Sequence, residues 1–218
     1  MAHGGEARDA MLARIGERIG PVRAAYRDAL LQVDRARYVR AVDRAAAWVD
    51  EPLPLDTPHG SAVATISAPH VYALGFDALD LVAGDRLLEL GSGSGYGAAL
   101  AAHVVGPQGL VTTVEVDPSF VALTARLDAA LPNVRVVHDD GLQRPDLVAA
   151  HDKCWLTFSV DALPEALTAA IPEGGVLVAP VGPGVDQRFV RVRRRDGRLH
   201  VDDLGAVRFV RARPRIPA

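Results

Sequence analysis

A glycine-rich segment behind a short apolar run constrains the fold of this chain more than any other feature. The segment reads LLELGSGSGYG and spans Leu87 to Gly97. Leu87, Leu88 and Leu90 predict a buried strand, and the glycines after it allow positive φ angles and close approach of a ligand. A strand that turns through glycines into a helix is shared by several kinds of nucleotide-binding fold.

Apolar, strand-like runs alternate with helical stretches after this segment. Expected strands cover 110–116, 134–141, 154–158 and 175–182, and expected helices cover 118–131, the region of Asp146, and 163–171. A helix expected over 71–81 leads into the glycine segment. Such alternation predicts a Rossmann-like, doubly wound, mostly parallel sheet with helices on both faces. Two further strands, near Arg188–Arg193 and Val207–Arg211, are expected to complete seven strands as an antiparallel edge.

The N-terminal part has a different pattern. Apolar residues from Ile15 to Val33 recur at spacings of three and four, so Ala7 to Asp50 is expected to be helical, with a break at Pro21. Glu51 to His70 contains four prolines and is expected to be a long loop. We therefore expect residues 1–70 to form a helical cap with a substrate loop and 71–218 to form the core of one compact domain.

Bulk composition indicates a cytoplasmic globular protein. Its 218 residues hold one cysteine, Cys154, so an internal disulfide is impossible. There is no apolar run long enough for a membrane span and no secretory signal at the start. Paired cysteines with metal-ligand spacing are absent and the histidines are scattered, so no metal site is expected.

Charge is unevenly distributed along the chain. Ten arginines and three aspartates between Gln187 and Arg215 give +7, while the whole chain carries -3 and the remainder therefore -10. One interpretation is a basic edge that meets an acidic peptide or a nucleic acid. The interpretation we favour is a solvated hairpin with arginines on its open face, because charge runs of this length usually lie at the surface.

Three acidic residues follow the first three expected strands of the core. Glu89 precedes the first glycine, Glu115 ends the next strand, and Asp140 ends the third. The GxGxG spacing differs from the dinucleotide fingerprint, and no GK[ST] follows it. A carboxylate after the second strand can hold a ribose, and the three together suit a cationic nucleoside, S-adenosyl-L-methionine. The alternative is that these acids only cap helices.

The candidate cofactor-binding residues are Glu89, Gly91, Ser92, Gly93, Gly95, Tyr96, Glu115, Asp140 and Gly141.

Several motifs resemble the protein-L-isoaspartate O-methyltransferases. TISAPH (Thr65 to His70), the glycine segment, DDG (Asp139 to Gly141) and APVGP (Ala179 to Pro183) occur in that family's order. The similarity covers roughly Val33 to Val210. The resemblance implies methylation of an isoaspartyl or aspartyl carboxylate in a peptide or protein, giving an ester that can collapse to a succinimide.

The resemblance also implies an acceptor site. Ser67 matches the family's active-site serine, with Thr65 and His70 beside it in the loop lining the acceptor pocket. An acceptor carboxylate is already ionised at neutral pH, so placement matters more than a strong base. His70 as a proton acceptor and His70 as a hydrogen-bonding loop residue both remain open, and no base partner for a nucleophilic Ser67 is visible.

Three departures from the family pattern leave the substrate open. The loop from Leu55 to Ala64 is about five residues longer than expected, Thr157 to Asp161 replaces a small alanine-rich stretch, and Asp139 replaces a glycine. One hypothesis is a dedicated tailoring enzyme that converts a normal aspartate of a ribosomally made peptide to an aspartimide. The other is loop drift in a repair enzyme.

Rival classes are a nucleic-acid methyltransferase, a binder without catalysis and a dehydrogenase. The segment at Thr157 and Phe158 lacks the aromatic-proline motif of several nucleic-acid methyltransferases. Intact Ser67 and Glu89 speak against lost catalysis, and the glycine spacing speaks against a dehydrogenase. We expect neither a membrane nor a nucleic acid as partner, and the sequence does not indicate an oligomeric state.

Overall fold

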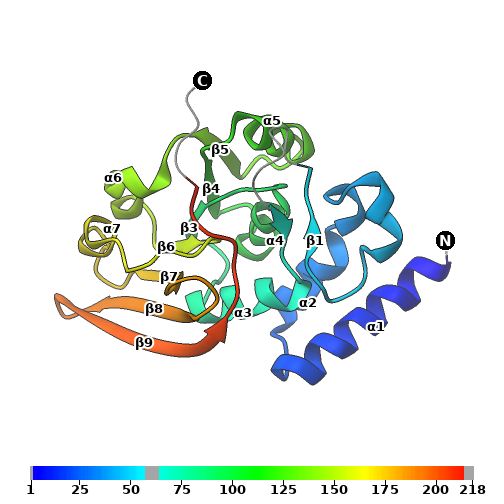
Figure 1. Cartoon of the computed structure of the whole chain (residues 1–218), viewed down its shortest axis with the longest axis horizontal. Coiled ribbons are helices and arrows are strands. Elements are labelled where there is room, and N and C mark those ends of the chain that lie inside the picture. Colours follow the sequence, from blue (N-terminus) through cyan, green and yellow to red (C-terminus); the bar gives the residue numbers. More distant parts are fainter. Residues whose placement is uncertain (1, 57–63, 214–218) are drawn as a thin grey trace.

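The computed structural model describes residues 2–56 and 64–213. Its main sheet has seven strands in the order β5-β4-β3-β6-β7-β8-β9 (Figure 1). The first five run parallel, while β8 and β9 add an antiparallel edge. This architecture confirms the predicted mostly parallel sheet of seven strands. The predicted extra length between Leu55 and Ala64 lies largely outside the described residues.

The strands are β3 (Arg86–Leu90), β4 (Leu110–Glu115), β5 (Val134–His138), β6 (Lys153–Leu156), β7 (Val176–Val181), β8 (Gln187–Arg195) and β9 (Arg198–Val207). The core helices are α3 (Pro69–Leu79), α4 (Tyr96–Val105), α5 (Pro118–Leu127), α6 (Pro145–Ala149) and α7 (Glu165–Ala169).

Alternating side chains of the central strands feed two hydrophobic clusters. Leu87, Trp155 and Val178 belong to the cluster that includes residues of α3 and α4. Leu88 and Leu177 belong to the other cluster, which includes residues of α6 and α7. Because successive strand residues point to opposite faces, Glu89 shares the face of Trp155, its partner across the β3–β6 pairing. The acid therefore lies on the α3 and α4 side of the sheet.

The N-terminal segment is helical but broken more often than predicted. It contains α1 (Ala2–Ile19), α2 (Ala24–Gln32) and two 3₁₀ helices, Arg35–Arg37 and Ala41–Ala46. The helices stop before Pro21, as expected, because proline cannot continue an α-helix. Figure 1 shows α1 at the outside of the molecule, and α1 contacts α3.

The predicted long loop is partly ordered into a small sheet. β1 (Leu53–Pro54) pairs antiparallel with β2 (Thr65–Ile66), with Leu53 opposite Ile66 and Pro54 opposite Thr65. Helix α3 then begins at Pro69, where proline suits a first helical turn. The long loop predicted from Glu51 to His70 is therefore interrupted by two short strands, and α3 begins before its predicted end.

The arginine-rich segment is a hairpin. Asp196 and Gly197 adopt positive φ angles of 52° and 70° at the turn between β8 and β9. Arg188 pairs with Asp203, and Arg191 and Arg193 pair with Asp202. This pairing agrees with the solvated hairpin that the sequence favoured.

The last strand ends earlier than predicted. β9 spans Arg198–Val207, so the strand expected at Val207–Arg211 was wrong. Residues 208–213, called the C-terminal arm below, instead leave the sheet edge and run back across the molecule (Figure 1). The arm forms a single parallel bridge between Arg211 and Ser159. Among the described residues, no helix is both long and apolar enough to cross a membrane.

Candidate active site

A cavity opens at the carboxyl ends of β3, β4, β5 and β6, where ligands bind in open α/β sheets. The space between its walls, open solvent at its mouth included, is about 930 Å³. Of the twelve predicted site residues, nine lie in its wall: Thr65, Ser67, Glu89, Gly91, Ser92, Gly93, Glu115, Asp140 and Gly141. The structure thus brings together residues that are up to 76 positions apart in the chain.

The floor of the cavity is the glycine turn after β3. Gly91 has a φ of 99°, and a Cβ there would lie 2.5 Å from Thr157 Oγ1. Gly95 has a φ of 88° and precedes the first residue of α4. Both positions require glycine, because larger residues rarely adopt these angles. The turn therefore presents backbone, without side chains in the way, to whatever occupies the cavity.

Glu89 is buried beneath this turn. It is 1% exposed, and its Oε2 accepts a hydrogen bond of 2.6 Å from the Thr113 hydroxyl. Burial raises the pKa of Glu89 to about 8, although the Thr113 bond lowers it. A Cβ on Gly97 would overlap the other carboxyl oxygen. Ionisation of Glu89 is therefore costly in the empty cavity, and a cationic group bound beside the carboxylate would favour it.

Glu115 stands at the end of β4 with its carboxylate fixed by backbone. It accepts N–H groups from Gly93 at 3.2 Å, Val116 at 2.8 Å and Asp117 at 3.1 Å. Burial raises its pKa, whereas these three donors lower it. A carboxylate has about four acceptor positions, so Glu115 keeps capacity for a hydroxyl donor from the cavity.

Asp140 both caps a helix and lines the cavity. Its carboxylate accepts the Leu142 N–H at 3.1 Å at the start of the 3₁₀ helix Gly141–Gln143. The capping alternative weighed from the sequence therefore applies to Asp140, without removing it from the wall. The neighbouring Asp139, one of the departures, accepts a 2.5 Å hydrogen bond from Arg144.

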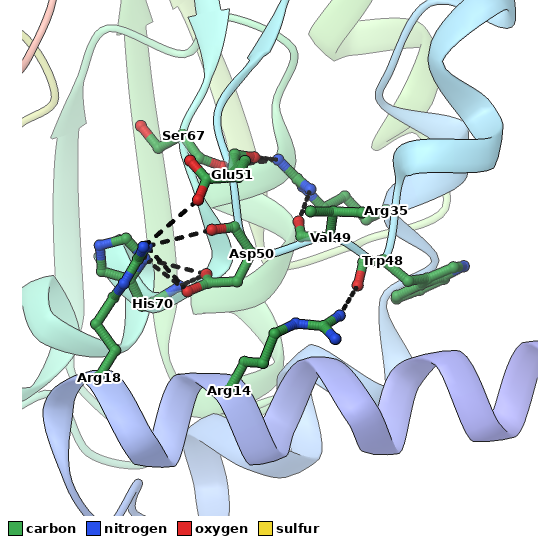
Figure 2. Close-up of polar contacts among 9 residues, drawn as sticks. All are labelled: Arg14, Arg18, Arg35, Trp48, Val49, Asp50, Glu51, Ser67 and His70. Atoms are coloured by element: carbon green, nitrogen blue, oxygen red, sulfur yellow. Dashed lines mark hydrogen bonds and ion pairs between the residues drawn. The ribbon is translucent and has the colours of Figure 1, made fainter.

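The opposite end of the cavity is built on β2 and the turn behind it. Thr65 and Ser67 are half-buried there. A buried guanidinium, that of Arg35, donates to the Ser67 carbonyl at 3.0 Å and to the Glu51 carbonyl at 2.9 Å (Figure 2). It also donates to the carbonyls of Ala47 and Val49. Arg35 therefore ties the turn at Ser67 to the segment before β1.

His70 lies outside the cavity wall, unlike the expectation for it. Its Nδ1 is 3.0 Å from both carboxyl oxygens of Asp50 and 3.1 Å from the Arg18 guanidinium. Figure 2 shows the Ser67 side chain pointing away from this ring. Through Arg18 of α1, the cluster connects the N-terminal helix to the start of α3.

Gly95 and Tyr96 also lie outside the wall. Tyr96 is 0% exposed, and its ring centroid lies 5.4 Å from that of Tyr38 and 5.2 Å from that of Tyr72. The structure thus gives the Tyr96 side chain a place in the core. The sequence motif predicted a cofactor-binding role for Tyr96 because this residue directly follows Gly95, the last glycine of the turn.

The C-terminal arm forms one side of the cavity, which sequence reasoning did not foresee. Val210 and Ala212 exchange backbone hydrogen bonds of 2.8 and 2.9 Å with Ser159. The Gln187 side-chain amide pairs with the backbone of Phe209. Its oxygen accepts the Phe209 N–H at 2.7 Å, and its nitrogen donates to the Phe209 carbonyl at 3.1 Å. Phe209, Val210, Arg211 and Arg213 all lie in the wall. The arm thereby closes a side that the sheet leaves open.

Two ion pairs flank the arm. Arg211 pairs with Asp161 at 2.7 Å. Asp161 is one of the residues that depart from the family pattern, and its carboxylate therefore has a partner within this chain. Arg213 lies 3.7 Å from Asp117 and over the Phe120 ring. Phe158, the other departure, lines the cavity next to Gly91.

Comparison with known proteins assigns the family. Residues 10–215 match the family described as Protein-L-isoaspartate(D-aspartate) O-methyltransferase (PCMT). The chain belongs to this family. It is therefore an S-adenosylmethionine-dependent protein carboxyl O-methyltransferase, as the sequence predicted, and the rival classes are not favoured.

Individual relatives agree with the assignment. The chain is 39% identical over 184 residues to a protein-L-isoaspartate O-methyltransferase of Methanococcus aeolicus, covering 84% of this chain and 82% of that one. It is 38% identical to protein-L-isoaspartate O-methyltransferase 1 of Archaeoglobus fulgidus, with the same coverage of both chains.

Solved structures agree as well. One protein-L-isoaspartate O-methyltransferase superposes with a TM-score of 0.84 at 26% identity, covering 95% of this chain and 66% of that one. A second, from Plasmodium falciparum in complex with S-adenosyl-L-homocysteine, gives a TM-score of 0.79 at 24% identity, covering 94% and 97%. The latter likeness bears on the fold alone.

Proposed function

We propose that the chain methylates the α-carboxylate of L-isoaspartyl residues in proteins, with Ser67 and Thr65 at the acceptor end of the cavity. Glu89, Glu115 and Asp140 would hold the amino, ribose and adenine parts of the cofactor, over the backbone of Gly91, Ser92, Gly93 and Gly141. Gly95 and Tyr96 would act only by shaping the turn and the start of α4. S-adenosylmethionine supplies the methyl group.

The opposite charges at the two ends of the cavity carry this proposal. Four acids line one end, namely Glu89, Glu115, Asp139 and Asp140, and Arg35 lies behind the other end at Ser67. A positive ligand is stabilised beside the acids and a carboxylate beside Ser67, because charges interact strongly in a partly buried site. A cationic methyl donor and an anionic acceptor match this arrangement.

The chemistry needs placement more than proton transfer. An acceptor carboxylate is ionised at neutral pH, so its oxygen attacks without a base. The Ser67 hydroxyl can donate a hydrogen bond that orients it, while the walls exclude water. His70 then serves as a positioning residue that connects α1 to α3, which its contacts with Asp50 and Arg18 support.

General repair of isoaspartate is the better-supported substrate hypothesis. Two residues that depart from the family pattern had suggested a dedicated peptide substrate. Both have partners within this chain, since Asp139 pairs with Arg144 and Asp161 pairs with Arg211. The relatives named above carry the isoaspartate activity in their names. In this proposal residues 1–70 are the cap and substrate loop and 71–218 the cofactor core. The cytoplasmic location remains a prediction from the sequence.

The test uses purified protein, methyl-labelled S-adenosylmethionine and two peptides that differ only in L-isoaspartate or L-aspartate at one position. We expect base-labile methyl ester on the isoaspartyl peptide alone. The Ser67→Ala variant should lose most of this activity while still binding S-adenosyl-L-homocysteine. Label on neither peptide, with cofactor binding intact, would contradict the proposal and point to a dedicated substrate.

A further inference from the structure

Tyr72 of α3 reaches the acceptor end of the cavity from a second element. It is 7% exposed and lies in the cavity wall with Ser67. Its ring stands edge-on to Trp155, with centroids 6.0 Å apart, and edge-on to Tyr96 at 5.2 Å. Rings packed on two sides in this way hold one orientation. The phenol is therefore a fixed part of the cavity.

Tyr72 lies beside Ser67, with which it lines the cavity. Burial is the largest influence on the Tyr72 pKa and raises it well above its ordinary value. Arg35 lowers the pKa, Glu89 raises it, and hydrogen bonds with the Ser67 backbone and side chain lower it again. The phenol thus keeps its proton at neutral pH and remains a donor. Two hydroxyl-bearing side chains from different elements thus line the same cavity.

The charge around this pair favours an anion. Arg35 is 0% exposed, and within the described part of the chain no carboxylate lies at ion-pair distance from it. Its positive charge is balanced by backbone carbonyls alone at close range. A buried cation without a counter-ion is costly, so a carboxylate bound near Ser67 would relieve part of that cost.

We propose that Tyr72 is a second binding residue for the acceptor, and that its hydroxyl and the Ser67 hydroxyl donate to the same substrate carboxylate. This inference rests on the proposed function. Two donors from two elements fix both the position and the rotation of the carboxylate, which a single serine cannot do. The ester product has lost its charge and accepts more weakly, so it is held less tightly than the substrate.

The Tyr72→Phe variant tests this assignment because it removes only the hydroxyl and keeps both ring contacts. Loss of a hydrogen bond to a charged group predicts a fall in kcat/KM of about ten- to a hundredfold for an isoaspartyl peptide, mainly through KM. The affinity for S-adenosyl-L-homocysteine should stay within about twofold, since the acids of the cofactor end are untouched.

Tyr26→Phe is the matched control. The Tyr26 hydroxyl is also buried, and it donates to the Phe76 and Leu81 carbonyls at 3.0 Å, away from the cavity wall. This variant should lose thermal stability and keep its KM. A double-mutant cycle of Ser67→Ala and Tyr72→Phe should give a combined loss different from the product of the single losses, because both donors bind one group.

Each outcome decides between the claims. If the wild-type protein methylates the isoaspartyl peptide and Tyr72→Phe matches it in KM and kcat, the role of Tyr72 is refuted and the proposed function stands. Equal effects of Tyr72→Phe and Tyr26→Phe on KM would also refute it. If the wild-type protein binds S-adenosyl-L-homocysteine but methylates no isoaspartyl peptide, the proposed function and this inference both fall.

Discussion

Replacing Glu89 by glutamine should stabilise the ligand-free protein while weakening its complex with the cofactor. Burial raises the pKa of Glu89 from 4.5 to about 8. The unfolded chain therefore releases this proton near pH 4.5, whereas the folded chain keeps it until about pH 8. A proton bound more tightly by the folded state makes stability fall as pH rises through this window.

The expected size follows from the two pKa values. Each pKa unit corresponds to about 1.4 kcal/mol. Ionisation of the unfolded chain then costs the wild-type protein about 3 kcal/mol of unfolding free energy by pH 7 and about 4 kcal/mol by pH 8, where the folded group is itself half ionised. Glutamine does not ionise, so the variant escapes this loss. Its advantage should grow by about 1.4 kcal/mol for each pH unit in the window.

Urea unfolding in one-unit steps from about pH 5 to 8 measures this difference. Glu17→Gln on the exposed face of α1 is the matched control, since Glu17 is exposed to solvent. Its stability should follow the wild-type curve at every pH. Parallel curves for Glu89→Gln and the wild-type protein would refute the reasoning, because the buried carboxyl would then titrate as it does in the unfolded chain.

Cofactor binding should move in the opposite direction. A bound cation favours ionised Glu89, so wild-type affinity for S-adenosylmethionine should rise with pH up to about pH 8. The glutamine variant should bind about tenfold more weakly and lose most of that pH dependence. Calorimetric titration at the same pH values measures both effects, and unchanged affinity would show that Glu89 does not face the cation.

Three further substitutions test other parts of the site. Gly97→Ala places a Cβ against the Glu89 carboxyl, so calorimetry should show cofactor affinity reduced at least about tenfold with the fold retained. Arg35→Met leaves four carbonyls without their donor and should lower the unfolding free energy by about 3 kcal/mol in urea and raise the peptide KM. Arg213→Ala removes the contact with Asp117 and should speed cofactor release severalfold in stopped-flow while changing stability by less than about 1 kcal/mol.

The core of the fold was predictable because its signals are local. Short apolar runs set the parallel strands, and Asp117-Pro118 marks the start of α5 through a side-chain cap and a proline at the first helical position. The last strand was misplaced, although its signal was present. Asp196-Gly197 is a typical hairpin turn dipeptide, and it requires a strand to start immediately after it, at Arg198.

The cofactor end was predictable and the acceptor end only partly so. Parallel strands bring their carboxyl ends to one edge, so acids at the carboxyl ends of three consecutive strands must lie together. Arg35 and Tyr72 reach Ser67 from a 3₁₀ helix and from α3, and no spacing along the chain encodes that meeting. His70 was misplaced for a related reason. Three residues after Ser67, the chain has already entered α3, and the helix turns the ring toward Asp50.

The charges at the two ends of the cavity also bear on how the reaction is driven. Glu89 holds its proton up to about pH 8 when no cation faces it, and among the described residues no carboxylate lies at ion-pair distance from buried Arg35, so each end is costly in the free protein. Binding of the cofactor's ammonium group and of an acceptor carboxylate relieves both costs. Methyl transfer then removes the charges of the sulfonium and of the carboxylate, while the ammonium opposite Glu89 keeps its charge. A reaction that consumes opposite charges proceeds best where water does not stabilise the separated ions. The enclosed cavity therefore needs to exclude water and align the reactants, and a strong general base would add little.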